Sequence, residues 1–436
     1  MTTYARRLGL FSGTMAVVGG IVGGGIFRTP AVVAERLESS AGILGAWIAG
    51  AVIALAGALC FGELGRRRPY AGGGYVYLRD AWGPLPAFLY GWALLLVIAT
   101  GAIAAVAVTF ADYALALSGL PRRFAVPVAV AAIVFVSLVN YCGVRPGAAL
   151  QNLFTVLKLL ALAGLIGAGL GAADLPRPEA ASGSAVTLGG FGAALVPILF
   201  TYGGWQQTNF IAAEMVEPER RLPQALLLGV GIVVLVYLGA NLAYLRVLGP
   251  AGLAVSTAPA ADTLEAALGP AGGRLIAAGI AASTFGFLNL VVLVTPRVLQ
   301  AMAADGLFFG RLADLHPVHR TPAAALLVQG VWAVALTLTG SFNQLVDYVT
   351  FADWIFFGLT VAGLFVFRAR EQREAMPAPG FRVPGYPWTP ALFVAAAACV
   401  VASSIAANPR NALVGAGLLL LGVPAFIASR RVTRRT

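Results

Sequence analysis

Lys158 is the only lysine among the 436 residues of this chain, and it lies in the middle of an apolar stretch, 148–170. It is the only charged residue of that stretch. An ionisable side chain at such a depth of a bilayer is costly, and it usually has a function and a partner. An ammonium in a dry site can lose its proton, which a guanidinium does not do. We therefore predict a functional role for Lys158; a snorkelling or structurally paired lysine is the alternative.

Two glycine clusters interrupt long apolar segments at corresponding places. One is VVGGIVGGGIFRTP (17–30) and the other is ILFTYGGWQQTNF (198–210). A shift of 180 residues superposes Gly23–Gly24 on Gly203–Gly204. Each glycine weakens a helix by about 1 kcal/mol relative to alanine. Paired interruptions in two halves of a membrane protein indicate a binding site at a repeat interface, whereas close packing of small residues is the alternative.

The predicted breaks leave backbone groups free for binding. The second half of the first span is expected to begin near residues 24–26, where free N–H groups and the positive end of the helix dipole would face an anion. The first half of the sixth span is expected to end near residues 200–202, where free carbonyls would face a cation. Such a site suits a zwitterion with an α-carboxylate and an α-ammonium. An amino acid is the simplest ligand of this kind.

The composition is that of an all-α integral membrane protein. Apolar residues make up 59% of the chain and charged residues 11%, which excludes an ordinary soluble protein. Segments long enough to span a bilayer recur along the whole length. No soluble domain fits between them, so we predict a single domain, 1–436. The twelve predicted spans are 8–33, 41–64, 85–116, 124–142, 148–170, 188–213, 224–247, 273–296, 321–340, 347–366, 389–407 and 411–429.

The net charge of +11 is unevenly distributed between the two sides of the predicted spans. With the N-terminus placed inside, the cytoplasmic segments hold 20 arginines and the external segments hold eight. This positive-inside bias predicts a multi-pass protein of the cell membrane with both termini in the cytoplasm. Anionic lipid headgroups are the expected partners of the basic face, and nucleic acid is not an expected partner.

The remaining reactive residues give no sign of a cofactor. Cys60, Cys142 and Cys399 have no paired spacing, so neither a disulfide nor a metal site is expected. His316 and His319 lie three residues apart in a loop without further ligands, which is a weak metal signal. The sequence contains no phosphate-binding loop and no HExxH helix. We expect no metal, no cofactor and no enzymatic activity.

Six further motifs follow one another along nearly the whole chain. They are IVGGGIF (21–27), FGELGRRRPYAGGGYVYLRDAWGP (61–84), TVLKLLALA (155–163), FTYGGWQQTNFIAAEMVEPERRLP (200–223), RVLQAMAADGLFFGRL (297–312) and FRVPGYPWTP (381–390). In this order they resemble the amino acid–polyamine–organocation (APC) superfamily, and within it the prokaryotic L-type amino acid transporter-like permeases. The resemblance implies twelve helices, with 8–171 and 188–367 as inverted repeats and 388–430 as two peripheral helices. It implies alternating access around a site between helices 1, 3, 6, 8 and 10, with helices 1 and 6 broken.

The resemblance also implies roles for single residues. The backbone around Gly24 would hold the substrate carboxylate, although this chain has glycine where the family pattern has serine, so one hydroxyl donor is missing. Phe200 occupies the position of an aromatic gate. Lys158 occupies the position of a lysine that replaces a sodium ion, so transport would be sodium-independent; loss of its proton would give a proton symporter, and retention an exchanger or facilitator. The expected substrate-binding residues are Ile21, Gly23, Gly24, Gly25, Ile26, Phe200, Tyr202, Gly203, Trp205 and Phe285, and Asn289, Gln206 and Tyr237 are further plausible contacts.

Neutral L-amino acids are the expected substrates, because predicted helices 1, 6 and 8 contain no Asp or Glu in their central portions. A cationic amino acid or polyamine antiporter is the alternative, and it requires Asp112 or Asp353 to face the site. Arg28 would draw an anionic side chain or lie in the outer vestibule. A channel or a membrane-embedded sensor is the alternative of another class. A channel needs no occluding aromatic side chain, and a sensor usually carries a soluble output domain.

Two further expectations concern contacts outside the site. Eukaryotic L-type transporters have a cysteine between helices 3 and 4 that bonds an ancillary subunit, whereas this chain has SGLPRRF (118–124) there. We therefore expect no disulfide-linked partner. Glu63 and Glu214 lie at cytoplasmic span ends, where pairing with nearby arginines is the expected role.

Overall fold

The computed structural model describes residues 3–172, 187–340, 342–374 and 380–433, without the side chains of 188, 342–351 and 430–433. Every regular element of these residues is a helix, apart from one isolated bridge between Leu8 and Met215. The prediction of an all-α protein is therefore confirmed for the described part of the chain.

Nine helices among the described residues are long and apolar enough to cross a membrane. They are Ser40–Arg67, Pro84–Ser118, Arg122–Tyr141, Val144–Gly171, Pro218–Val247, Pro270–Ala304, Ala352–Glu374, Trp388–Ala407 and Pro409–Ser429. Two shorter apolar helices, Leu10–Ile21 and Ala323–Thr339, accompany them. The membrane architecture is confirmed at this level, while the count of twelve spans and the inverted repeat stay predictions.

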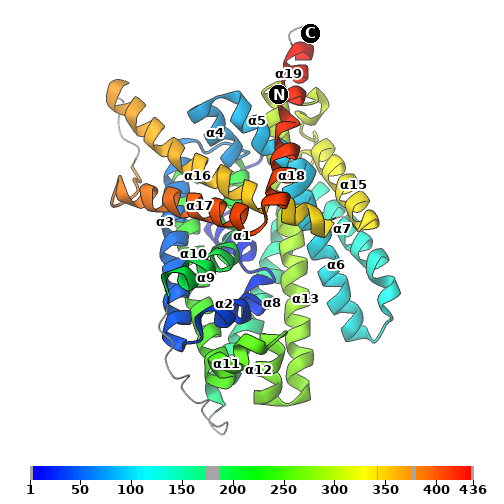
Figure 1. Ribbon diagram of the computed structural model, residues 1–436. Coiled ribbons are helices and arrows are strands. Elements are labelled where there is room, and N and C mark those ends of the chain that lie inside the picture. The colour runs from blue at the N-terminus through cyan, green and yellow to red at the C-terminus, as the bar shows by residue number, and fades with distance from the viewer. Residues whose placement is uncertain (1–2, 173–186, 341, 375–379, 434–436) are drawn as a thin grey trace.

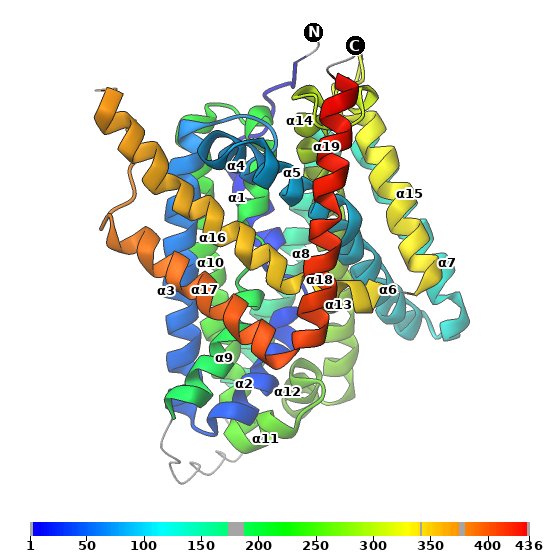
Figure 2. The same cartoon turned by 45° about the horizontal axis from the view of Figure 1, so that its top comes forward.

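The long helices form two packed groups (Figures 1 and 2). One contains α1 (Leu10–Ile21), α3 (Ser40–Arg67) and α10 (Pro218–Val247); the other contains α6 (Ala99–Ser118), α7 (Ala125–Tyr141), α13 (Pro270–Val294) and α15 (Ala323–Thr339). The helix α8 (Val144–Gly171) contacts α1 and α10 of the first group and α13 of the second. It therefore links the two groups.

Shorter helices cover the two ends of these groups. Figures 1 and 2 place α4 (Gly74–Trp82) at one end, and α11 (Gly249–Val255) with α12 (Pro259–Leu268) at the opposite end. At the end that carries α4, α14 (Pro296–Ala304) continues the span of α13, and α19 (Gly422–Thr433) continues the span that begins at Pro409. The remaining elements are α2 (Thr29–Leu37), α5 (Pro84–Ala93), η2 (Leu94–Ile98), η3 (Arg122–Phe124), α9 (Leu188–Thr201), η4 (Trp205–Glu214), η5 (Gly310–Leu312), α16 (Phe342–Glu374), α17 (Trp388–Ala407) and α18 (Pro409–Leu420).

The first and sixth predicted spans are both interrupted. Helix α1 ends at Ile21, a short 3₁₀ turn covers Gly25–Phe27, and α2 begins at Thr29. Helix α9 ends at Thr201, and the 3₁₀ helix η4 begins at Trp205. Both predicted breaks are therefore confirmed, at the glycine clusters that indicated them.

Buried ion pairs hold the helices together at the end that carries α4 and α14. The Glu214 carboxylate accepts two hydrogen bonds from the Arg297 guanidinium, at 2.9 and 3.0 Å, and both side chains are buried. Glu63 accepts a hydrogen bond of 2.6 Å from Arg368 and also pairs with Arg67. The expected pairing of both glutamates with arginines is confirmed. Breaking such buried pairs is strongly destabilising, because it leaves an uncompensated charge.

Candidate functional site

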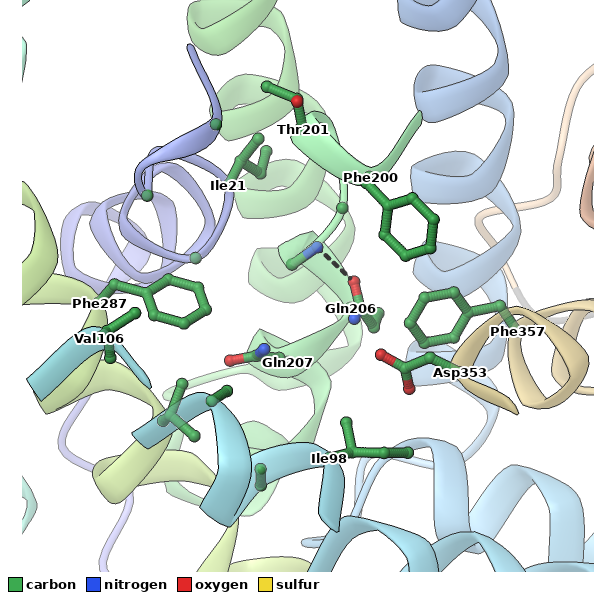
Figure 3. Close-up of a pocket in the computed structure, with 18 of the residues that line it drawn as sticks. Ile21, Ile98, Val106, Phe200, Thr201, Gln206, Gln207, Phe287, Asp353 and Phe357 are labelled. Atoms are coloured by element: carbon green, nitrogen blue, oxygen red, sulfur yellow. Dashed lines mark hydrogen bonds between the residues drawn. The ribbon is translucent and has the colours of Figure 1, made fainter. Parts of the chain in front are cut away.

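A cavity of about 500 Å³ lies where the two broken spans meet α5, α6, α13 and α16 (Figure 3). Its wall is largely apolar, with backbone groups of the two breaks on one part of it. The π-helical turn η2 adds Leu94 and Ile98, and such turns are frequent at functional sites. The breaks, rather than a loop region, therefore form the core of the site.

The first break exposes hydrogen-bond donors. The N–H groups of Gly24, Gly25 and Ile26 donate no hydrogen bond to any residue that the structure describes. Gly24 and Gly25 also line the cavity. Three consecutive free N–H groups at the start of a helical segment form a binding site for an anion such as a carboxylate.

The second break exposes hydrogen-bond acceptors. The carbonyls of Leu199 and Gly203 accept no hydrogen bond from the described residues, and both residues line the cavity. A carbonyl at the C-terminal end of a helix carries the negative end of the helix dipole, which favours a cation. Donors and acceptors thus lie in the same cavity, as a zwitterionic ligand requires.

Close contact between the two breaks explains why glycine is needed at them. Gly204 has φ +109°, and a Cβ atom built on it would lie 2.0 Å from the carbonyl oxygen of Gly20. A Cβ atom on Gly20 would lie 2.7 Å from the carbonyl oxygen of Gly204. Only glycine allows both this backbone conformation and this approach.

The Tyr237 hydroxyl connects the C-terminal ends of α1 and α9, the first halves of the two broken spans. The Tyr237 hydroxyl is 3.0 Å from the carbonyl oxygen of Ile21 and 3.3 Å from that of Thr201. Ile21 and Thr201 are the last residues of α1 and α9. Tyr237 is fully buried. It gives the Thr201 carbonyl a partner in an apolar environment and adds a second hydrogen bond to the Ile21 carbonyl, which also accepts one of 2.9 Å from the N–H of Gly23.

Lys158 reaches the first break from α8. Its ammonium donates to the carbonyl of Val22 at 2.6 Å and to that of Gly19 at 3.2 Å, and its side chain is fully buried. The Ser283 hydroxyl, on α13, donates to the carbonyls of Val22 and Gly23 at 3.1 and 3.0 Å. The lysine and the serine therefore satisfy the carbonyls freed where α1 unwinds.

A buried row of polar side chains holds α8 in place beside Lys158. Asn140 donates to Asn289 at 3.0 Å, and Asn289 donates to Gln151 at 3.1 Å. Gln151 then donates to Thr155 at 3.2 Å, and Thr155 donates to the carbonyl of Met15 on α1. Asn289 is thus a packing and hydrogen-bonding residue and does not line the cavity.

The predicted substrate contacts divide into two sets. The residues that line the cavity are Ile21, Gly23, Gly24, Gly25, Phe200 and Gly203, with Gln206 among the further candidates. The residues outside its lining are Ile26, Tyr202, Trp205 and Phe285, together with Asn289 and Tyr237. The Trp205 ring packs against Phe61, at 4.9 Å between centroids, and Phe285 packs against Phe154 at 4.6 Å. Both rings therefore pack between helices and do not line the cavity.

The structure also places residues at the cavity that the sequence analysis did not select. Phe287, Val291 and Thr295 of the eighth predicted span line it at a spacing of four residues, which is a helical period. Gln207 lines it from η4, and Figure 3 shows its side chain between Gln206 and Val106. This spacing does not single out Phe287 in the sequence, because Phe285 begins a series with the same spacing, and nothing in the sequence distinguished Gln207.

The three charged residues with open roles now have positions. Asp353 lines the cavity from α16. Asp112 instead pairs with Arg122 at the end of α6, through hydrogen bonds of 3.0 and 3.1 Å. Arg28 is exposed and does not line the cavity. The side chain of Asp347, a further acid of the same predicted span as Asp353, lies outside the described residues.

Comparison with known proteins agrees with this geometry. Residues 8–424 match the family model described as "Amino acid permease". The chain belongs to the amino acid permease family. The APC resemblance is thereby confirmed, and this family consists of transporters and not of enzymes.

Named relatives of this permease are amino acid transporters and exchangers. It is 34% identical to the b(0,+)-type amino acid transporter 1 of Homo sapiens over 86% of this chain and 79% of that protein. It is 31% identical to the serine/threonine exchanger SteT of Bacillus subtilis (strain 168), over 98% of this chain and 97% of that protein. It is also 31% identical to the Asc-type amino acid transporter 1 of Homo sapiens, over 97% and 82% of the two chains.

Proposed function

We propose that this permease carries neutral L-amino acids across the cell membrane by alternating access and without sodium. The backbone clamp supports the amino acid part of the proposal. Free N–H groups at Gly24 and Gly25, which line the cavity, bind the α-carboxylate together with the free N–H of the next residue, Ile26, whose side chain packs outside the cavity, and free carbonyls at Leu199 and Gly203 bind the α-ammonium. The largely apolar wall accepts an uncharged side chain.

The position of Lys158 is the observation that carries the proposal. Its ammonium lies against the carbonyls of Gly19 and Val22, which is where a sodium ion would otherwise be needed to compensate oxygen atoms at the break. Carbonyl and hydroxyl oxygens are the ligands that hard cations prefer, and Ser283 adds such a hydroxyl. A covalently attached cation at this place makes a dissolved one unnecessary.

Phe200 is the proposed gate. Its ring lines the cavity and stands 6.0 Å from that of Trp354, in an edge-to-face arrangement. An aromatic side chain at the end of a half-helix covers the substrate when the half-helix tilts. We further propose that both termini lie in the cytoplasm, that anionic lipids contact the arginine-rich face, and that no subunit is attached through a disulfide.

Uptake into proteoliposomes tests the role of Lys158. The wild-type protein is expected to take up labelled alanine or leucine equally well with sodium and with choline outside. Lys158→Ala is expected to abolish or uncouple uptake while the protein remains folded in detergent. Arg28→Ala, which removes an exposed cation outside the cavity, is the matched control and is expected to leave uptake unchanged.

A third variant separates the two coupling mechanisms. Lys158→Arg keeps the charge but cannot release a proton at ordinary pH. Exchange against internal amino acid that survives in Lys158→Arg identifies a fixed cation, whereas loss of pH-driven uptake in the same variant identifies a proton symporter. Sodium-dependent uptake by the wild type, or undiminished pH-responsive uptake by Lys158→Ala, contradicts the proposal.

A further inference from the structure

The carboxylate of Asp353 and the side-chain oxygen of Gln207 line the cavity and have no ion-pair or hydrogen-bond partner among the residues that the structure describes. Figure 3 shows the unwound α1 segment on one side of the cavity, Asp353 on the other, and Gln206 and Gln207 between them. We infer that Asp353 and Gln207 form a side-chain subsite that binds a cationic group, so that lysine-like amino acids are substrates in addition to neutral ones. This inference rests on the proposed function.

Asp353 is the only charged residue among the described residues that line the cavity. No ion pair between described side chains includes it. By contrast, Asp112 on α6 and Glu214 on η4, two other elements that contribute to the cavity, are each bound to an arginine. A carboxylate in an apolar, membrane-embedded cavity is unfavourable unless a cation or hydrogen-bond donor compensates it. A ligand with a positive side chain supplies that compensation.

Gln207 supplies the second, independent observation. Its side-chain oxygen Oε1 is buried and accepts no hydrogen bond, although the residue lines the cavity. Buried polar atoms in native structures nearly always have a partner. The neighbouring amide of Gln206 differs, because its oxygen accepts a hydrogen bond of 2.9 Å from the N–H of Gly204. The free oxygen of Gln207 therefore points to a hydrogen-bond donor on the ligand.

Aromatic rings complete the subsite around Asp353. Phe200, Trp354 and Phe357 all line the cavity. The centroid of the Trp354 ring lies 6.0 Å from that of Phe200 and 5.8 Å from that of Phe357. Aromatic faces attract ammonium and guanidinium groups. A carboxylate, an amide oxygen and aromatic rings together bind a cation better than they bind an aliphatic chain end.

The test compares lysine with norleucine, which has the same straight side chain without the amine. Uptake of both is measured in proteoliposomes of the wild type, of Asp353→Asn and of Gln207→Leu. In Asp353→Asn the KM for lysine is expected to rise at least about tenfold, because one partner of a desolvated charge pair is lost. The KM for norleucine is expected to stay within about twofold, because an apolar chain end forms no charge pair with Asp353. Gln207→Leu is expected to weaken lysine uptake several-fold with the same selectivity.

Asp112→Asn is the matched control, because it makes the same chemical change at an acid that lies outside the cavity and is paired with Arg122. Asp112→Asn is expected to leave the ratio of the KM for lysine to the KM for norleucine unchanged. If Asp353→Asn does not fold, the uptake of lysine and norleucine by Gln207→Leu alone tests the inference. Transport of norleucine but not lysine by the wild type, or an equal loss of both substrates in Asp353→Asn and Gln207→Leu, overturns the inference and leaves the proposed function standing. Transport of neither substrate overturns the proposed function itself.

Discussion

Gly24 offers the sharpest test of the backbone clamp, because this position can accept a side chain. Its backbone has φ −87° and ψ −15°, which any residue adopts. A Cβ atom built on it would meet no heavy atom within 4 Å. The resemblance described above implies serine at this position in other members of the superfamily. Gly24→Ser is therefore expected to add a hydroxyl donor to the cavity without displacing any neighbour.

The expected gain follows from the number of donors. The N–H groups of Gly24, Gly25 and Ile26 are free to bind a carboxylate, and a serine hydroxyl would be a fourth donor. A hydrogen bond to a charged group contributes about 1.5–3 kcal/mol. We take the lower end, about 1.5 kcal/mol, because the hydroxyl must also give up water and rotational freedom. That free energy lowers the dissociation constant of an amino acid roughly tenfold.

The assay is binding of alanine or leucine to the purified protein in detergent, by calorimetry or by ligand-induced thermal stabilisation. Two neighbouring glycines serve as controls. A Cβ atom on Gly25 would lie 2.9 Å from the Thr201 side chain, and one on Gly204 would lie 2.0 Å from the Gly20 carbonyl. Gly25→Ser and Gly204→Ala are therefore expected to weaken or abolish binding, in contrast to Gly24→Ser.

The reasoning would be refuted by two results. If Gly24→Ser weakened binding as strongly as Gly25→Ser, the space beside Gly24 would have to be occupied by the ligand itself. If Gly24→Ser strengthened binding of an amine that lacks the carboxylate as much as that of the amino acid, the hydroxyl would contact some other part of the ligand. Either result would contradict the expected hydrogen bond between the added hydroxyl and the carboxylate.

Two further variants test the gate and the packing. Phe200→Ala should slow turnover more than it raises KM, because the ring covers the substrate and makes few of the binding contacts; equal changes in both, measured by initial-rate uptake, would indicate a simple contact. Glu214→Gln should lower the free energy of unfolding by about 3–5 kcal/mol, because Arg297 remains buried without its partner. The control is Glu217, which forms a more exposed pair with Arg221. Glu217→Gln should change the free energy of unfolding by less than about 1 kcal/mol. Similar melting temperatures of these two glutamine variants in detergent would contradict the argument.

The features that could be predicted from the sequence depend on rules that hold for any backbone. Glycine clusters at matched positions predicted the breaks because Gly204 needs a positive φ and Gly20 a close approach. The place of Lys158 in an apolar span predicted hydrogen-bond acceptors around its side chain, because a buried ammonium requires them. The carbonyls of Gly19 and Val22 supply them. In each case the residue type alone indicated the kind of contact that the folded chain had to supply.

Trp205 and Phe285, the predicted aromatic contacts that do not line the cavity, depend instead on which face of a helix carries each side chain. Trp205 begins a 3₁₀ helix, in which successive side chains turn by about 120° and not by the 100° of an α-helix. Gln206, Gln207 and Phe210 of this helix line the cavity, whereas Trp205 lies on the remaining face and packs against Phe61. Phe285 and Phe287 lie two residues apart in α13, which is buried on nearly all sides around them. An apolar stripe does not exist there, so the sequence could not indicate which phenylalanine faces the ligand.

The Tyr237 hydroxyl has a consequence for the movement of the site. It lies within hydrogen-bond distance of the last carbonyl of α1 and the last carbonyl of α9. The close contact between Gly20 and Gly204 holds the same two segments together immediately beside it. We therefore expect the two binding segments to move together, which would keep the distance between the carboxylate and ammonium pockets constant during the proposed alternating access. Recognition of the amino acid backbone would then be independent of the direction in which the gate opens.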